Sequence, residues 1–480
     1  MRLRNVETAN VLPFGAKVEH SLSDVYSQGK LVAQEVKSKL ILNDIKYSEP
    51  LLILYPTREQ IGFFGELKIE GCLKNVSGDK IGEIHIPKGY TIESGRTHFG
   101  SWEEYTVKVI PTEIYIRHTV NGEDRKANVT FFLTDNEVVN PWGTSERSFT
   151  GEVKTELKSR VILKFVDNWT ARFEKYFHHE VTTIEEVKGS FSASHLVLTL
   201  EKNNCSISSV DAVRTLSDLV DKLILYLSFG SRQRTIWTKW ITKIGNDLVR
   251  YYYRAAIPEK KSAYEEPLVG RSSVQEFLQH CLEYESQQKN LDLFLPIAYL
   301  VNADRSGKTI ESQFLSLFMS LEALLDLYAE SRDKNKHFAT DTWKKFYCHM
   351  KKAIKDFSYP TDKEEYEKLM IEKLWIFNQP SKKILYSNYC DEMGIDNSDL
   401  WPIYGKDPDL SYIRNNLIHG KRLKYGSGFF VANEHLKWTV ERCLLAALGW
   451  KGNSDVSHGA LSKYTASRNW ESYYESKNEI

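Results

Sequence analysis

The hydrophobic periodicity changes part-way along the chain, and this change constrains the fold more than any other feature. Up to about residue 205, segments such as ANVTFFLTD and HLVLTLE carry β-branched and aromatic residues, and several alternate apolar with polar side chains. From residue 209 onwards, apolar residues recur at helical spacing. The pattern predicts an α+β chain, with an antiparallel, β-rich and sandwich-like region first and an all-α helical bundle after it.

Helices are predicted over residues 209–229, over 308–328 and around 436–447, each from an apolar stripe on one face. Ser208 or Ser209 can cap the first helix and Gly230 can end it. Between this helix and the bundle, RTIWTKWITK and LVRYYYRAA are predicted to form short strands.

The length of 480 residues exceeds one ordinary core, so two or three domains are expected. IPEKKSAYEEPLVG (257–270) is polar and bears two prolines, which places the main boundary there. We therefore expect a β-rich region over 1–260, a helical domain over 271–450 and a polar tail over 451–480. The polar segment 140–152 is a candidate split of the β-rich region into two lobes.

Charge and cysteine content narrow the class of protein. Lys plus Arg and Asp plus Glu both number 64, so the formal charge of the chain is zero. A neutral protein would need a local basic patch to bind nucleic acid. The six cysteines are widely spread without a CxxC pair, which argues against a disulfide framework and a zinc ribbon. With no signal-like N-terminus and no long apolar run, we expect a cytoplasmic protein that does not enter a membrane.

The segment LSYIRNNLIHGKRLKYGSG (410–428) places an arginine inside an apolar helical arc. On a helical wheel, Arg414 falls among apolar side chains, whereas Asn415 and His419 fall together on another side, one turn apart. A buried arginine needs an anionic partner. Glu322 points into the apolar stripe of the 308–328 helix, so we expect Glu322 and Arg414 to face each other.

This arrangement resembles the HEPN family. Arg-x4-His with Asn after the Arg and Gly after the His, in an all-α domain, is the family's pattern. SLEALLDLYAE upstream and YIRNNLIHG downstream are similar to the ApeA-type HEPN domains of bacterial anti-phage proteins. The resemblance has motif support over residues 271–450 and is only architectural before that. Two other Arg-to-His matches, Arg172 with His178 or His179 and Arg332 with His337, lack this context.

The resemblance implies a metal-independent endoribonuclease without a cofactor, in which the ribose 2′-OH attacks the adjacent phosphate. His419 would act as general acid or base, and Arg414 would clamp the phosphate. Asn415 would orient His419 or donate to a phosphate oxygen, and Glu322 would hold Arg414. The resemblance further implies a homodimer through the HEPN domain, an RNA substrate with tRNA as one candidate, and a phage-derived trigger protein sensed by the β-rich region.

Local cationic residues would provide contacts to RNA. Lys421, Arg422 and Lys424 follow the motif directly. A second candidate is the helix predicted in TWKKFYCHMKKAIKD, where Lys344, Lys351 and Lys355 share one face. Both sets can equally be solvated surface.

Other interpretations stay open. Arg414 with Glu322 can be a structural ion pair, and His419-Gly420 can be an ordinary helix C-terminus. The HEPN domain would then be a catalytically silent dimerisation or binding module beside a ligand-binding β-sandwich. A third interpretation is a carbohydrate- or peptide-binding sandwich that uses a surface aromatic cluster including Trp237 and Trp240.

Overall fold

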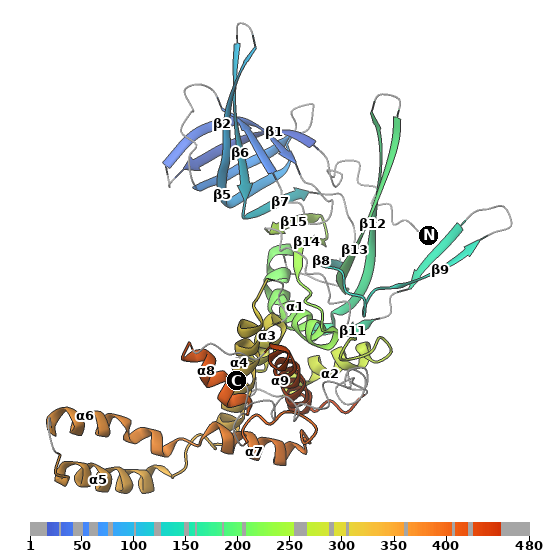
Figure 1. Cartoon of the computed structure of the whole chain (residues 1–480). Helices are drawn as coiled ribbons and strands as arrows, with labels where there is room; N and C mark the ends of the chain where they lie inside the picture. The colour runs from blue at the N-terminus through green and yellow to red at the C-terminus, as the bar shows by residue number, and fades with distance from the viewer. Residues whose placement is uncertain are drawn as a thin grey trace. The chain divides into compact units, whose positions relative to one another are not determined.

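The computed structural model shows an antiparallel β-sheet region followed by helices, so the chain is α+β (Figure 1). The chain divides into two compact units, one holding the strands and most of α1, the other holding most of the helices. The structure describes residues 17–27, 30–41, 51–56, 66–74, 80–99, 102–119, 126–147, 153–158, 161–184, 187–203, 208–253, 266–287, 292–303, 307–359, 363–405, 409–420 and 426–452.

Six strands of the first unit pair into a closed antiparallel ring. Their neighbours run β1-β2-β3-β6-β5-β4, and β4 pairs back onto β1. The strands are β1 (Lys17–Ser27), β2 (Lys30–Ile41), β3 (Leu51–Tyr55), β4 (Glu66–Lys74), β5 (Lys80–Phe99) and β6 (Trp102–Pro111). The sequence predicted two facing sheets, whereas this ring closes one sheet on itself. Closure leaves fewer open sheet edges.

Alternation of side chains explains why these strands pack as they do. Buried aliphatic residues with exposed fractions of 6% or less alternate with more exposed neighbours such as Lys68 and Glu83. The buried set comprises Leu52, Leu54, Leu67, Ile69, Ile84, Ile86, Val107 and Val109. The period-two pattern in the sequence is therefore confirmed here as a strand signal with one apolar face.

The sheet continues from β5 through the remaining large strands. Its order is β5-β7-β15-β14-β8-β13-β12-β11, all antiparallel. The strands are β7 (Glu113–Thr119), β8 (Ala127–Leu133), β11 (Ile162–Lys164), β12 (Thr170–Ile184), β13 (Val187–Lys202), β14 (Trp237–Ile244) and β15 (Asp247–Tyr253), with a 3₁₀ turn η2 (Val166–Asn168). The short strands predicted after the first helix are β14 and β15.

Two details of this unit add to the sequence prediction. The described part of the candidate split at 140–152 contributes β9 (Trp142–Arg147), which pairs with β10 (Val153–Lys158). Strands on both sides of that segment, β8 and β14, pair directly with each other. Helix α1 (Ser209–Ser231) begins as predicted, with the Ser208 hydroxyl accepting the Asp211 N–H at 3.2 Å. It continues past Gly230 and is followed by Arg232 at φ 50°.

The second unit is built around α4 (Ile310–Ser331), which packs against α3, α7, α8 and α9. Those helices are α3 (Phe294–Ala303), α7 (Lys382–Met393), α8 (Leu410–Ile418) and α9 (Gly426–Ala447), and α2 (Val274–Gln287) precedes them. Phe314 of α4 packs on Phe318 and on Phe429 of α9, with ring centroids 5.5 and 5.3 Å apart. The predicted stripes of α4 and α9 thus form this unit's core.

Three further elements stand apart from this core. Helices α5 (Thr340–Asp356) and α6 (Lys363–Lys373) form a hairpin, which the 3₁₀ helix η3 (Leu374–Asn378) follows (Figure 1). The buried Asn378 ties the base of the hairpin by accepting the His337 N–H at 2.9 Å and the Phe338 N–H at 2.8 Å. Part of the expected boundary (257–265) and the tail beyond residue 452 lie outside the described residues.

Candidate functional site

Helix α8 carries the motif, and Asp409 fixes its first turn. The Asp409 carboxylate accepts the Tyr412 N–H at 2.7 Å and the Ser411 hydroxyl at 2.8 Å. Its other oxygen accepts the Gly405 N–H at 2.7 Å. A buried carboxylate at a helix N-terminus satisfies free N–H groups and complements the helix dipole. Sequence reasoning did not single out Asp409, although Asp before a helical stripe is an N-cap signal.

The other end of α8 lies at the motif histidine. The His419 N–H donates to the Asn415 carbonyl at 3.1 Å, and Gly420 adopts φ +65°. This left-handed residue ends the helix, as the sequence allowed. The side chains of Asn415 and His419 are both exposed. The histidine therefore closes a helix and presents its ring to solvent at the same time.

The predicted ion pair between α8 and α4 is present. Arg414 Nη2 donates to both carboxylate oxygens of Glu322, at 3.0 and 3.1 Å. The two side chains are 30% and 25% exposed, so the pair is partly buried, less so than the position of Arg414 in an apolar arc suggested. On the same arc, Ile418 is 53% exposed, because it lies in the last turn of the helix.

Asn415 contacts the arginine. Its side-chain oxygen accepts from Arg414 Nη1 at 3.2 Å. Arg414 is thus held from two sides, by Glu322 of α4 and by its neighbour on α8. The structure brings together Glu322, Arg414 and Asn415, and it places His419 one turn further along the same helix.

Two residues that sequence reasoning missed lie beside the pair. Lys382 of α7 contacts the Asp326 carboxylate and donates to the Glu322 carbonyl oxygen at 3.5 Å. Burial, and next the Glu322 carboxylate, raise the pKa of Tyr404 above its ordinary value. No periodic signal marks Lys382 or Tyr404, because one is the first residue of a short helix and the other lies in a loop.

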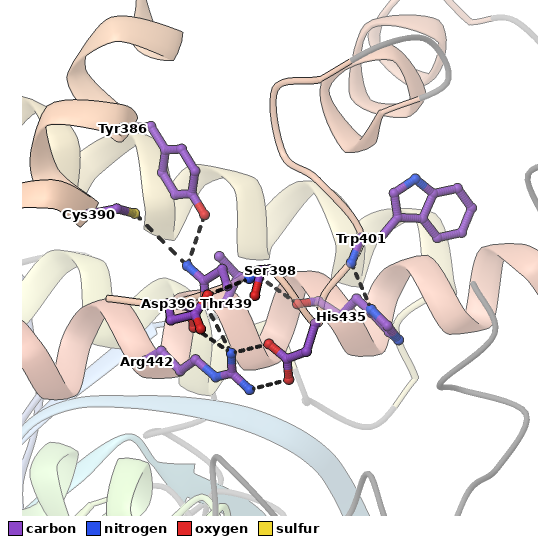
Figure 2. A network of polar contacts seen from close by, with 10 residues as sticks. Tyr386, Cys390, Asp396, Ser398, Trp401, His435, Thr439 and Arg442 are labelled. Atoms are coloured by element: carbon purple, nitrogen blue, oxygen red, sulfur yellow. Dashed lines mark hydrogen bonds and ion pairs between the residues drawn. The ribbon is translucent and has the colours of Figure 1, made fainter. Parts of the chain in front are cut away.

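A polar network holds the loop that leads to α8 (Figure 2). Arg442 of α9 forms a bidentate pair with Asp399 at 2.6 and 2.8 Å, and its guanidinium lowers the pKa of that carboxyl. The buried His435 accepts the Trp401 N–H at Nδ1, at 2.9 Å. By fixing residues 399–401 on α9, these bonds set the path of the chain towards Tyr404 and Asp409.

The same network includes two free cysteines. Asn397 donates to the Tyr386 hydroxyl at 3.0 Å and lies 3.9 Å from the Cys390 sulfur. A hydrogen bond with Cys443 is the main cause that lowers the pKa of Cys390, whereas the same contact and burial raise the pKa of Cys443. These contacts join α7 to α9 and to the loop between α7 and α8.

The predicted RNA-binding cations and the other Arg-to-His matches lie away from the pair of Arg414 and Glu322 or outside the described residues. Lys421, Arg422 and Lys424 lie outside the described residues. Lys344, Lys351 and Lys355 are exposed on α5. Of the other Arg-to-His matches, Arg172 lies in strand β12, and Arg332 pairs with Glu392 at 2.8 Å.

Trp240 does not belong to a surface cluster. It is 4% exposed and stacks on Tyr251 with ring centroids 5.2 Å apart. The Trp237 indole N–H donates to Asp221 of α1 at 2.7 Å. Trp240 is therefore a core packing residue, whereas Trp237 is half-buried.

Within the described ranges, no group of three or more His, Cys, Asp or Glu side chains could hold a metal ion. None of the described helices combines the length and apolarity needed to span a membrane. Comparison with protein-family models, with curated proteins and with solved structures finds no match to this chain.

Proposed function

We propose that the helical unit is a HEPN-type, metal-independent endoribonuclease and that the protein is a cytoplasmic effector of bacterial anti-phage defence. The observation that supports this most is the held arginine beside an exposed histidine. Glu322 and Asn415 engage Arg414 from two helices, and His419 stays open to solvent. A catalytically silent bundle does not need to keep this histidine exposed.

In the proposed reaction, the ribose 2′-OH attacks the adjacent phosphorus while the bond from phosphorus to the 5′ oxygen breaks. The products are a 2′,3′-cyclic phosphate and a 5′-OH. One proton leaves the 2′-OH and one reaches the departing oxygen, and His419 serves one of these transfers. Arg414 stabilises the negative charge that builds on the phosphorane oxygens. The other proton transfer would be served by the same motif in a second copy of the chain, facing the first.

Arg414 needs rotational restraint for this role, because a free arginine loses entropy when it clamps a phosphate. Both carboxylate oxygens of Glu322 accept hydrogen bonds from Arg414 Nη2, and the side-chain oxygen of Asn415 accepts one from Arg414 Nη1. Glu322 is therefore a positioning residue. With its oxygen engaged on Arg414, the Asn415 amide nitrogen is the part that could donate to a phosphate oxygen.

RNA would bind through local positive charge. Lys421, Arg422 and Lys424 follow the motif, and α5 carries exposed lysines on one arc. The proposal includes regulation by the β-rich unit, since an unrestrained ribonuclease would damage its own cell. A phage protein is the proposed trigger.

The second candidate is a silent HEPN module that binds a partner or dimerises, next to a ligand-binding β-region. The observation behind it is the end of α8, where His419 and Gly420 at φ +65° form an ordinary helix terminus. In this case His419 has no chemical role, and its replacement would change nothing beyond the helix end.

The test is cleavage of total cellular RNA by the purified full-length protein in EDTA, with mapping of the cut ends. Arg414→Ala and His419→Ala are compared with His337→Ala, which removes an exposed histidine from another Arg-to-His match. Cleavage with cyclic-phosphate ends by the wild type and His337→Ala alone supports the proposal. Equal cleavage by His419→Ala rejects the assigned role. If no protein cleaves RNA, growth is compared between phage-infected cells that carry the wild type and those that carry His419→Ala. Growth arrest that depends on His419 indicates an untriggered nuclease, and no such dependence indicates a silent module.

A further inference from the structure

Two free cysteines of the helical unit meet where α7 packs on α9. Cys390 lies on α7 and Cys443 lies on α9. Tyr389, the neighbour of Cys390, donates its hydroxyl to the Cys443 carbonyl at 2.7 Å, which fixes the two helices on each other at this point. The two thiols are themselves hydrogen-bonded to each other. Sulfur atoms in such contact need only rotations of their side chains to reach the bond length of a disulfide, about 2.05 Å.

The two thiols differ in exposure and in acidity. Cys390 is half-buried, whereas Cys443 is fully buried. The hydrogen bond with Cys443 lowers the pKa of the Cys390 thiol in spite of its burial, and a hydrogen bond from Tyr386 adds to this effect. The same contact with Cys390, followed by burial, raises the pKa of the Cys443 thiol. Cys390 is therefore the thiol that more readily forms the reactive thiolate, and Cys443 stays protonated beside it.

The other described cysteines lack this combination. Cys348 is exposed on α5, and Cys72 is half-buried in β4. Cys281 is buried, and burial raises the pKa of its thiol. Within the ranges that the structure describes, none of these three is hydrogen-bonded to another thiol. A reactive thiol beside a second thiol thus distinguishes the contact of α7 with α9.

We propose that Cys390 and Cys443 are an oxidation site, at which a peroxide converts the two thiols into a disulfide. The Cys390 thiolate sulfur attacks one oxygen of hydrogen peroxide, the bond between the two oxygens breaks, and hydroxide leaves and takes up a proton as water. Cys390 then carries a sulfenic acid. The Cys443 sulfur attacks the Cys390 sulfur, the bond from sulfur to oxygen breaks, and the hydroxyl leaves with the Cys443 proton as a second water. The peroxide is reduced by two electrons, and the two thiols are oxidised by two.

The position of the pair gives the oxidation a consequence for the loop that leads to α8 (Figure 2). Asn397 of this loop lies 3.9 Å from the Cys390 sulfur. Arg442, the neighbour of Cys443, donates to the Asp396 carbonyl at 2.8 Å. A disulfide changes the partner of Asn397 and ties α7 covalently to α9 beside the same loop. The proposal does not depend on the ribonuclease activity, because its evidence and its test concern the two thiols.

The test treats the reduced, folded, full-length protein with hydrogen peroxide and maps its disulfides by mass spectrometry of unreduced peptides. The remaining thiols are blocked by alkylation before digestion, so that disulfide exchange stops. The expected result is a peptide that joins Cys390 to Cys443 within one chain and is lost on reduction with dithiothreitol. The same treatment in urea is the control for proximity. It should lower the yield of this peptide about tenfold or more, because the two thiols no longer meet.

Variants test the assigned order of the two steps. Cys443→Ser should stop at the sulfenic acid, which dimedone labels at Cys390. Cys390→Ser should leave Cys443 unlabelled, because Cys443 is buried. The matched control is Cys348→Ser, which removes an exposed thiol outside the pair and should form the disulfide at the wild-type rate. The peptide map of the wild type needs no variant, so it decides the proposal even where a variant fails to fold.

Three results would overturn the proposal. The first is a wild type that, with excess peroxide, gives no peptide joining Cys390 to Cys443. The second is a disulfide that joins Cys348 of two chains in its place. The third is dimedone labelling of Cys443→Ser at Cys348 but not at Cys390.

Discussion

Arg414 of α8 and Glu322 of α4 form a bidentate contact through a single guanidinium nitrogen, at 3.0 and 3.1 Å. The residues are 92 positions apart in sequence. The pair lies where two apolar stripes meet, yet 30% and 25% of the two side chains remain exposed. The arginine is therefore held between two helices while part of it stays open to solvent.

This partial exposure predicts a modest contribution of the pair to stability. A double-mutant cycle with Arg414→Ala and Glu322→Ala should give a coupling energy of about 1 kcal/mol, because solvent screens the interaction. If Arg414 clamps a phosphate, Arg414→Ala should slow RNA cleavage about 100-fold or more. Urea unfolding and cleavage rates on the same variants measure both. A coupling of several kcal/mol with unchanged cleavage would identify a purely structural pair.

The two residues that end α8, His419 and Gly420, are expected to have different roles, one chemical and one structural. Gly420 adopts φ +65°, where an L side chain is strained, so Gly420→Ala should destabilise the chain by about 1 kcal/mol. The His419 side chain is exposed, so His419→Ala should leave the unfolding midpoint nearly unchanged. Cleavage should show the opposite order, with loss in His419→Ala and retention in Gly420→Ala. Thermal unfolding with the RNA assay checks both; equal retention would leave His419 with no chemical role.

The pairing of Glu322 with Arg414 could be predicted because helical periodicity fixes the direction of a side chain within each helix. Glu322 lies between Phe318 and Leu325 on the stripe of α4, and Arg414 lies beside Ile413 on α8. Once both stripes pack in one core, the two charges have few other partners. Local pattern was enough for this contact.

Other features depend on contacts that local pattern does not determine. The ring of β1–β6 requires β3 to pair with β6, with Leu52 opposite Val109, and nothing in either segment specifies that partner. Tyr404 reaches the pair because the loop after α7 is held on α9 by Arg442 and His435, and Lys382 reaches it because α7 packs on α4. The exposure of Tyr366, Leu369 and Met370 on α6 was also unforeseen, since helical spacing normally marks an inward face.

The carboxylate of Glu392 predicts a pH-dependent contribution to stability. The hydrogen bond from Tyr328 at 2.7 Å, followed by that from Lys334 at 2.9 Å, lowers the pKa of Glu392 from 4.5 to about 2. Its folded pKa lies below its unfolded value, so the contribution is complete above pH 4.5. It is lost as the pH falls from there towards 2.

Glu392→Gln should therefore lower the urea midpoint at pH 7, by a free energy of about 1 kcal/mol because the site is partly exposed. The difference from the wild type should shrink as the pH falls below 4.5. The exposed Glu330 provides the control, since Glu330→Gln should change little at either pH. A difference that stays constant with pH would show that Glu392 acts by packing and not by charge.

A second ion pair of the helical unit, unlike Arg414 with Glu322, is expected to cause a large loss of stability when one partner is removed. Arg232 donates to both oxygens of Glu441, at 2.8 and 2.5 Å, and the side chains are only 4% and 1% exposed. Arg232 also donates to the Glu266 carbonyl at 3.1 Å. Removing one partner leaves an uncompensated buried charge, so Glu441→Gln should cost about 3–5 kcal/mol.

The loss should be specific to breaking the pair. Arg232→Met combined with Glu441→Leu removes both charges and fills their volume, so this double variant should recover most of the lost stability. Glu322→Gln, at the partly exposed pair, should cost only about 1 kcal/mol in the same urea titration. Similar costs for Glu441→Gln and Glu322→Gln would contradict the assignment of Arg232 and Glu441 as a buried, mutually dependent pair.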